Sequence, residues 1–306
     1  MSFLEGDEEF RVLQNWDKLA SAFEIPMENF LVLNQVHGDN IFVIKPHGDY
    51  FSSREALNYD AIVTNRMNLA ICIKTADCVP VFLVDRVKKI IGAVHAGWRG
   101  SALGISAKVA RLMQTSYGSQ PADILAAIGP SIGRCCYEID TATADSFRNQ
   151  KNAGTFLVPA KRKGRWMLDL AEANRRQLLD CGVPDTNIET AGLCTVCRQD
   201  TFFSHRGSGG ITGRQINFMM IKGDTFCKAL LVNGVSERIH ESETDVRAQN
   251  DGGDRHIRDQ RSSPRQRNFY QEQFPLSNGR ICRESKRRST SRQHHLCAHR
   301  GYSKKG

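Results

Sequence analysis

Four short apolar runs lie close together near the middle of the chain, and they constrain its fold more than any other feature. They are the segments Ala61–Thr64, Leu69–Ile73, Val79–Val84 and Ile90–Val94. Each has four to six residues, and such short, apolar, β-branched-rich runs are typical of strands that are buried on both faces. The sequence therefore predicts a central sheet that other elements must cover.

Amphipathic segments on either side of these runs predict the covering helices. Apolar residues recur at helical spacing in residues 8–23 and in a helix predicted to begin near Ser101 or Leu103 and to end at Tyr117. A third helix is expected after Asp169, which is followed three residues later by Glu172 in a capping-box pattern.

Weaker patterns mark the remaining elements. Further strands are predicted near residues 30–35, 40–44, 122–128, 188–194 and 216–221. Residues 46–58 are rich in turn-forming residues and predict a surface loop, in which His47 is solvated. The polar, lysine-rich residues 145–165 predict a loop or a frayed helix.

Three residues that a hydrophobic core does not need stand at or near the ends of predicted strands. They are His37, Cys78 and His95. Two imidazoles and one thiolate are what a zinc ion with one open coordination position requires. We therefore predict that these residues bind zinc and act in catalysis, and that the neighbouring Asp77 orients a ligand or relays protons.

Three arginines lie in glycine-containing turns that suit an anionic group. Arg99 follows His95 in the turn HAGWRG, and Arg206 and Arg214 lie on either side of a glycine-rich segment. A guanidinium binds phosphate through two parallel N–H donors, and free N–H groups at the start of the next helix add to such a site. We predict that these arginines bind substrate or phosphate, and we rank Arg99 first.

Two further pairs of cysteines carry a weaker signal. Cys194 and Cys197 form a CxxC motif that has no second pair at the spacing of a structural zinc site, and Cys135 and Cys136 are adjacent. We interpret both pairs as half-buried thiols. A redox pair or half of a metal site is the alternative for the CxxC motif.

The N-terminus and the apolar content bear on location. The first residues, MSFLEGDEEF, have no signal-peptide pattern, and no apolar run approaches the roughly 20 residues that cross a bilayer. The ten cysteines are therefore expected to be reduced in a cytoplasmic protein that has no membrane partner.

The net charge of +9 is concentrated at the C-terminal end. Residues 222–306 contain 18 Lys and Arg against 10 Asp and Glu, whereas residues 1–221 contain 24 against 23. The sequence predicts a near-neutral domain over 1–221 and a basic, disordered tail over 222–306. Nucleic acid is therefore expected as a partner only through this tail.

Six motifs then carry a family resemblance. In order they are NQVHGD, DAIVTN, TADCVPV, AVHAGWRG, AIGPSIGRCCYEI, and FFSHR followed by TGRQINF. Together they resemble the laccase-domain (YfiH-like) family, whose members were long described as multicopper polyphenol oxidases and are now understood as zinc-dependent purine nucleoside phosphorylases. The resemblance covers residues 6–221 and implies a single α/β domain of layered β-sheets flanked by helices. It also implies that His37, Cys78 and His95 are the zinc ligands.

The resemblance further implies the reaction and the partners. Family activity is phosphorolysis of adenosine, inosine, guanosine and S-methyl-5′-thioadenosine, together with adenosine deamination, so that a purine nucleoside and phosphate are the expected partners. Members carry a further N-terminal segment and stop soon after the strand that matches 216–221. A truncated start and a frameshifted end are therefore implied for this chain.

Other functions use the same residues. Copper-dependent oxidation of polyphenols would make copper the cofactor. However, residues 1–221 contain only four histidines, at 37, 47, 95 and 205, and no His-x-His pair of the kind common in copper sites. A metal-free cysteine hydrolase would use Cys78 as nucleophile and His95 as base. A binding module tethered by the basic tail is the non-enzymatic alternative, and the oligomeric state is left open.

Overall fold

A computed structural model describes residues 6–45, 58–223 and 225–230 of the chain. Most of the predicted loop over 46–58, including His47, and the predicted tail beyond residue 230 lie outside the described residues. None of the helices in the described part has the length and apolarity that a membrane span requires.

Three β-sheets and five α-helices make up the described part of the chain. The largest sheet has six strands in the order β11-β7-β5-β6-β3-β2, the second has the order β1-β4-β12-β13, and a small third sheet has the order β8-β10-β9. The strands are β1 (Phe30–Val32), β2 (Ile41–Ile44), β3 (Ala61–Thr64), β4 (Ala70–Thr75), β5 (Val79–Asp85), β6 (Ile90–Ala96), β7 (Ile124–Ile128), β8 (Glu138–Asp140), β9 (Leu157–Pro159), β10 (Arg165–Leu168), β11 (Ile188–Thr190), β12 (Gln215–Lys222) and β13 (Thr225–Leu230). The helices are α1 (Glu9–Phe23), α2 (Trp98–Ala102), α3 (Ile105–Tyr117), α4 (Thr141–Arg148) and α5 (Leu170–Asp180), with short 3-10 turns at Met27–Asn29, Pro121–Asp123, Ala153–Thr155 and Asp185–Asn187.

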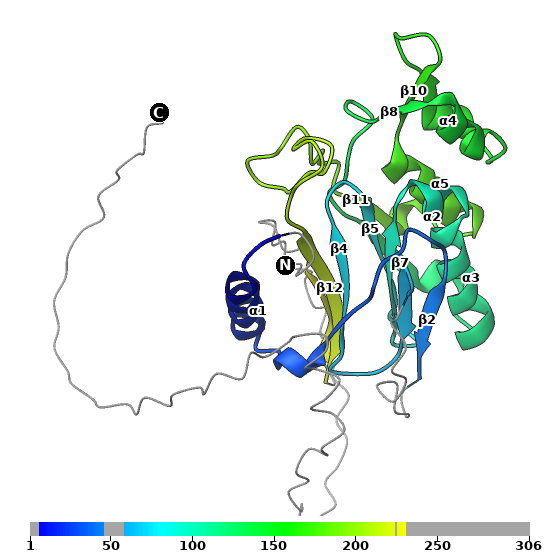
Figure 1. The fold of residues 1–306 in the computed structure, drawn as a ribbon. Coiled ribbons are helices and arrows are strands. Elements are labelled where there is room, and N and C mark those ends of the chain that lie inside the picture. The colour runs from blue at the N-terminus through cyan, green and yellow to red at the C-terminus, as the bar shows by residue number, and fades with distance from the viewer. Residues whose placement is uncertain (1–5, 46–57, 224, 231–306) are drawn as a thin grey trace, which may run out of the picture.

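The two larger sheets are stacked between helices. One hydrophobic cluster fills the space between α1 and the four-stranded sheet, a second lies between the two sheets, and the third lies between the six-stranded sheet and helices that include α3 and α5. Figure 1 shows α1 beside β4 and β12, and α3 on the far side of the six-stranded sheet. The expected layered α/β architecture is confirmed.

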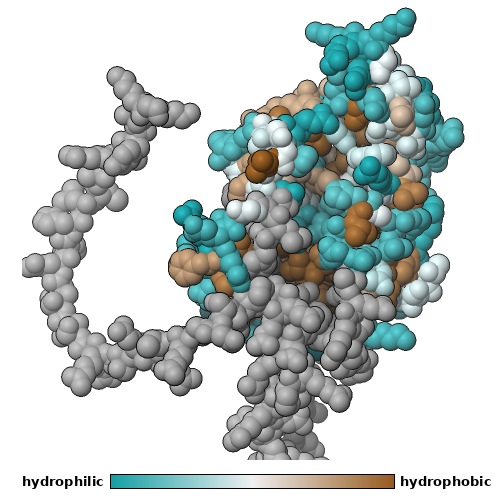
Figure 2. Space-filling view, viewed as in Figure 1, coloured by the Kyte–Doolittle hydropathy of each residue, from teal (hydrophilic) through white to brown (hydrophobic). Residues whose placement is uncertain are grey.

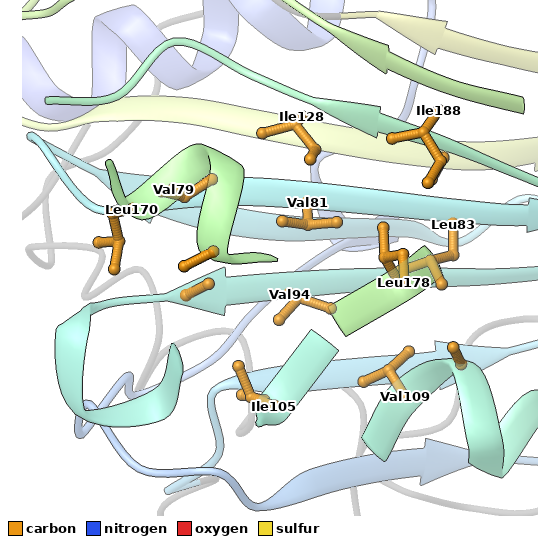
Figure 3. Close-up of a cluster of buried hydrophobic side chains, with 14 of the residues drawn as sticks. Val79, Val81, Leu83, Val94, Ile105, Val109, Ile128, Leu170, Leu178 and Ile188 are labelled. Carbon is orange, nitrogen blue, oxygen red and sulfur yellow. The ribbon is translucent and has the colours of Figure 1, made fainter. Parts of the chain in front are cut away.

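The stacking explains why the central strands are apolar without alternation. In β5, Val81 and Leu83 pack toward the helices, whereas the intervening Phe82 packs toward the second sheet. Figure 3 shows Val81 and Leu83 in one cluster with Val109 of α3. Successive side chains of a strand point to opposite faces, so that a strand buried on both sides needs apolar residues at every position.

Several predicted elements have the expected bounds. The helix predicted over 8–23 is α1, and the four central runs are β3, β4, β5 and β6. The helix α5 begins as the capping pattern predicts, because the side chain of Asp169 accepts a hydrogen bond from the backbone N–H of Glu172.

Other predictions were wrong. The helix expected from near Ser101 begins at Trp98 and is divided into α2 and α3 at Gly104, whose positive φ of 76° favours a residue without a side chain. The segment 145–165, expected to be a loop or a frayed helix, contains the end of α4 and all of β9. These short elements carry few residues each, so that their periodicity is weak in the sequence.

The second sheet also continues past the predicted domain boundary at residue 221. Strand β12 ends at Lys222, and β13 pairs with it in antiparallel fashion. The chain therefore adds at least one strand to the domain before residue 231.

The visible surface is mostly polar. Figure 2 shows a largely hydrophilic face with scattered hydrophobic side chains, and the small lobe that contains β8, β9, β10 and α4 ends in a hydrophilic tip. This distribution is ordinary for a protein surface.

Candidate metal centre

The three predicted metal ligands converge on one point. Ligand atoms of His37, Cys78 and His95 all lie within 4.8 Å of one another, and the two imidazole rings meet edge to face with centroids 4.8 Å apart. His37 is exposed, Cys78 is half-buried and His95 is 3% exposed. The cluster therefore joins the core of the domain to solvent.

Strand pairing brings Cys78 and His95 together. Strands β5 and β6 are antiparallel, and Pro80 of β5 is paired with His95 of β6. Cys78, two residues before Pro80, therefore lies at the same edge of the six-stranded sheet as His95.

Close approach of the loops completes the cluster. A Cβ atom on Gly97 would lie 2.9 Å from Cδ2 of His37 and 3.3 Å from Sγ of Cys78. His37 has a positive φ of 61°, which is unfavourable for a residue with a side chain. The glycine therefore allows the His37 loop to pack against the cysteine.

A buried carboxylate that sequence reasoning missed holds two of the three ligands. Oδ1 of Asp60 lies 2.7 Å from Nδ1 of His95, and the side chain accepts hydrogen bonds from the backbone N–H groups of His37 at 2.9 Å and Gly38 at 2.6 Å. Because Nδ1 of His95 is engaged in this way, Nε2 is the nitrogen left for a metal ion. The only sign of Asp60 in the sequence was its position as an acidic residue directly before a predicted buried strand.

The electrostatics of the cluster favour a charged thiolate. Burial raises the pKa of the Cys78 thiol, but the charge of His95 and hydrogen bonds from both imidazoles outweigh this effect, so that the pKa falls to about 6. Burial lowers the pKa of His95, whereas Cys78 and Asp60 raise it to about 9. Burial raises the pKa of Asp60, and its hydrogen bond with His95 contributes most to the net decrease.

These residues fit a divalent metal ion. The donor set is one sulfur and two nitrogens, and a hydrogen bond donated by the second ring nitrogen to a carboxylate, as from Nδ1 of His95 to Asp60, is typical of histidines that bind metals. Three protein ligands leave a tetrahedral ion with one open position. The site can hold zinc, and nothing in the donor set itself distinguishes zinc from copper.

The cluster opens into a cavity of about 440 Å³. It lies at one end of both large sheets, because its walls include the last residues of β4 and the residues next to β5 and β6. All seven predicted site residues line it, together with several others: Asn34, Gln35, His37, Lys74, Thr75, Ala76, Asp77, Cys78, His95, Trp98, Arg99, Ile132, Tyr137, Leu170, His205, Arg206 and Arg214.

The three predicted anion-binding arginines are held at the wall of this cavity. The Arg99 guanidinium stacks 4.5 Å from the ring centroid of Trp98. Nη1 of Arg206 donates to the carbonyl of Glu138 at 3.1 Å, and Nη1 of Arg214 donates to the carbonyl of Thr212 at 2.8 Å. The structure thus brings Arg99 to the same cavity as Arg206 and Arg214, which lie more than one hundred residues later in the sequence.

Asp77 has a different environment from the one expected for a proton relay. It is only 8% exposed, and Oδ1 accepts hydrogen bonds from the hydroxyls of Thr195 at 2.6 Å and Ser204 at 2.7 Å. Oδ2 accepts one from the backbone N–H of Arg206 at 2.7 Å. The carboxylate therefore anchors the loop that carries Arg206 beside the metal ligands.

Two aromatic residues of the cavity were also missed by sequence reasoning. Trp98 begins α2 and Tyr137 precedes β8, and both side chains line the cavity. Burial raises the pKa of Tyr137 most, with a further contribution from the charge of Cys78. Apolar and aromatic residues near glycines carry no distinct functional signal in a single sequence.

Four other cysteines form a separate cluster. The two predicted pairs, Cys135 with Cys136 and Cys194 with Cys197, come together in space, and their four sulfur atoms lie within 4.8 Å of one another. Cys136 and Cys194 are half-buried as predicted, whereas Cys135 and Cys197 are exposed, and all four are free thiols. This cluster, called the thiol cluster below, is distinct from the metal centre.

Comparisons with known proteins identify the family and the fold. Residues 1–222 match the family described as multi-copper polyphenol oxidoreductase laccase. The chain is 36% identical over 219 residues to the purine nucleoside phosphorylase YlmD of Geobacillus stearothermophilus, with 70% of this chain and 80% of the relative covered. It is 34% identical over 214 residues to the adenosine deaminase RL5 of an unknown prokaryotic organism, with 68% and 81% covered.

A solved structure has the same fold. The crystal structure of the hypothetical protein YfiH of Bacillus licheniformis superposes with a TM-score of 0.68 at 36% identity and covers 72% of this chain and 85% of that one. The YlmD structure from Geobacillus stearothermophilus superposes with a TM-score of 0.67 at 35% identity and covers 73% of this chain and 84% of that one.

Proposed function

Because the chain belongs to the family of multi-copper polyphenol oxidoreductase laccase proteins and is similar to relatives named purine nucleoside phosphorylase and adenosine deaminase, we propose that it is a zinc-dependent purine nucleoside phosphorylase. Its substrates in this proposal are adenosine, inosine, guanosine and S-methyl-5′-thioadenosine, with phosphate as the second substrate. It also deaminates adenosine, and it acts in the cytoplasm.

One observation carries the proposal. A single cavity of about 440 Å³ contains the two imidazoles and the thiol of the metal centre, three arginines and two large aromatic residues. The arginines supply the donors that a phosphate dianion requires. The rings of Trp98 and Tyr137 supply flat surfaces on which a purine base can stack.

Phosphorolysis requires that the nucleoside and phosphate be brought together in this cavity. The C1′–N9 bond of the nucleoside breaks with its electron pair going to the base, and a new bond forms between C1′ and a phosphate oxygen. The departing purine takes up the proton that phosphate releases. Arg99, Arg206 and Arg214 hold the phosphate and offset its charge as it approaches C1′.

The metal centre has a defined part in the proposal. His37, Cys78 and His95 hold the zinc ion, and Asp60 orients His95. A zinc ion with an open position supplies a Lewis acid and makes a bound water molecule more acidic. Asp77 lines the same cavity and fixes the loop of Arg206 by accepting a hydrogen bond from its backbone N–H.

The test is an assay of the purified chain with adenosine and phosphate. We expect adenine and ribose 1-phosphate as the products of phosphorolysis, and inosine as the product of deamination. Cys78→Ala should abolish both. Cys181→Ala is a matched control, because Cys181 is a half-buried thiol that directly follows α5, donates to the carbonyl of Ala107 and does not line the cavity. Absence of all three products, or equal turnover by Cys78→Ala and wild type, would contradict the proposal.

A single-variant series tests the phosphate site. Arg99→Ala, Arg206→Ala and Arg214→Ala are each expected to raise KM for phosphate more than KM for adenosine, because the guanidiniums face the phosphate. If the KM for phosphate stays constant in all three, the arginines do not form the phosphate site.

One arrangement favours a second function. Asp60, His95 and Cys78 form a chain in which a carboxylate orients an imidazole and the imidazole faces a thiolate, which is the order found in cysteine hydrolases. Activity that survives chelation of the metal and is lost on alkylation of Cys78 would favour this reading. Copper-dependent oxidation of phenols is tested in the same preparation by metal analysis and by the visible absorption spectrum.

A further inference from the structure

Two turns at the edge of the six-stranded sheet bring the thiol cluster together. Strands β7 and β11 are parallel neighbours, and the pairing continues past their ends in a bridge between Ser131 and Cys194. The turn after β7 carries Cys135 and Cys136, and the turn after β11 carries Cys194 and Cys197. Because both turns leave the same edge of the sheet, cysteines about sixty residues apart become neighbours.

The distances within the cluster match metal coordination. Sγ of Cys197 lies 3.6 Å from Sγ of Cys135 and 3.5 Å from Sγ of Cys136. A tetrahedral ion with Zn–S bonds of about 2.3 Å places its sulfur ligands about 3.8 Å apart. A disulfide would require about 2.05 Å, so the observed spacing fits four ligands around one ion.

The backbone around the cluster is arranged to approach the sulfur atoms closely. The backbone N–H of Gly133 donates to Sγ of Cys194 at 3.3 Å. A Cβ atom on Gly133 would lie 3.1 Å from Cβ of Cys194 and 3.3 Å from Sγ of Cys135. A side chain at this position would therefore push the two turns apart, and the N–H donor is suited to stabilise a thiolate.

Four thiols without a carboxylate or imidazole nearby form a soft donor set. Apart from the metal centre, no other group of three or more His, Cys, Asp or Glu side chains in the described part of the chain has its ligand atoms within 4.8 Å of one another. Four thiolates in a tetrahedral arrangement are a common ligand set of structural zinc ions, which have no open position for a substrate.

We propose that the thiol cluster binds a second zinc ion, which is structural and separate from the metal centre. The ion joins the turn after β7 to the turn after β11. The wall of the active-site cavity depends on both turns, because Tyr137 directly follows Cys136 and Thr195 directly follows Cys194. Tyr137 lines the cavity, and the hydroxyl of Thr195 holds Asp77.

Metal content of the zinc-loaded, gel-filtered full chain tests the proposal. Wild type is expected to contain two zinc ions per chain, and the double variant Cys194→Ser with Cys197→Ser one. The variant His37→Ala with Cys78→Ala removes the other site and should also contain one. Cys181→Ser should keep two, because Cys181 belongs to neither cluster.

Cobalt substitution distinguishes the two sites. A cobalt ion bound only by the thiol cluster, in the His37→Ala and Cys78→Ala variant, should show a thiolate-to-cobalt charge-transfer band about four times as strong as that of the metal centre, which has one thiolate. The band should be absent from a variant in which His37, Cys78 and all four cysteines of the thiol cluster are replaced.

Alkylation of the wild-type chain tests the thiol cluster even if the double variant does not fold. With zinc bound, the four cysteines should resist iodoacetamide, and all four should react after treatment with a strong chelator. A zinc content that is the same in wild type and in the Cys194→Ser and Cys197→Ser double variant, a disulfide within the cluster in the purified protein, or iron in place of zinc would each overturn the proposal. None of these measurements uses enzymatic activity, so failure of the proposed function would leave this result unaffected.

Discussion

At the scale of single residues, Asp60 has the largest influence on the metal centre. Its carboxylate is fully buried and links the His95 ring to the backbone of the His37 loop. A buried carboxylate in this position raises the basicity of the histidine and fixes the direction in which its other nitrogen points.

Asp60→Asn is predicted to weaken zinc binding at the metal centre by about 10- to 100-fold. The amide cannot accept hydrogen bonds with both of its heteroatoms, so that either the His95 ring or the His37 loop loses its partner. Zinc affinity is measured by competition with a chromophoric chelator. Asp39→Asn is the matched control, since Asp39 lies in the same loop but pairs with Lys108. Equal affinities in the two variants would show that Asp60 does not orient the ligands.

The acidity of Cys78 gives a second prediction at this scale. In metal-free protein its pKa is lowered to about 6, while His95, with a pKa of about 9, remains charged over the same range. The thiolate population therefore rises as pH increases through about 6, well below the ordinary range of a thiol. The measurement is the rate of alkylation by iodoacetamide, followed by mass spectrometry of each cysteine.

Cys181 is an internal control for this titration, because burial raises its pKa. Its alkylation is expected only at higher pH in the same samples. In Asp60→Asn the Cys78 midpoint should move upward, since His95 loses the partner that stabilises its charge. Coincident profiles for the two cysteines would contradict the proposed thiolate.

At the scale of elements, the short helix α2 depends on a buried polar network. Nδ2 of Asn174 in α5 donates to the Ser101 hydroxyl at 2.8 Å, and the Ser106 hydroxyl of α3 donates to Oδ1 of Asn174 at 2.7 Å. Nε2 of Gln177 donates to the carbonyl of Ser101 at 2.6 Å. One amide thus ties together the three helices on this side of the sheet, including the one that carries Trp98 and Arg99.

Asn174→Ala is predicted to lower the free energy of unfolding by about 2 to 3 kcal/mol, because two buried hydroxyls lose their partner and a small cavity forms. The measurement is unfolding in urea. Ser146→Ala, in the exposed part of α4, is the control and should change the free energy of unfolding by less than about 0.5 kcal/mol. If Asn174→Ala changed the free energy of unfolding as little as the control does, water would have replaced the amide as the partner of the two hydroxyls.

At the scale of the whole molecule, the described hydrophobic core is built from residues that precede the basic segment. Within the described part of the chain, the three hydrophobic clusters run from Val12 to Ile221, and β13 extends the second sheet to Leu230. Most of the net positive charge of the chain lies beyond this point.

A chain that ends at Leu230 is therefore predicted to have the same free energy of unfolding in urea as the full chain, within about 0.5 kcal/mol. It should also bind the same amount of zinc. Any affinity of the full chain for nucleic acid should be lost with residues 231–306 and should fall steeply with salt. A large loss of stability on truncation would show that these residues pack on the domain.

The local pattern of the sequence was sufficient for much of the fold. The central strands, α1 and the capped start of α5 follow from apolar runs, helical spacing and the Asp169 cap, all of which act over a few residues. The cluster of His37, Cys78 and His95 was also recognisable as a candidate metal site, because these residues stand at or near the ends of apolar segments. The motifs around them matched a known family.

Other features depended on tertiary structure alone. In the sequence, nothing distinguishes Asp60 from other acidic residues that precede a strand. Its role becomes visible only because the fold places it beside His95, 35 residues away. The thiol cluster exists only because β7 and β11 are parallel neighbours, which brings together two cysteine pairs that each look incomplete in the sequence. Sequence patterns report on neighbours along the chain, whereas metal centres are made of residues that the packing of distant strands brings within a few ångströms.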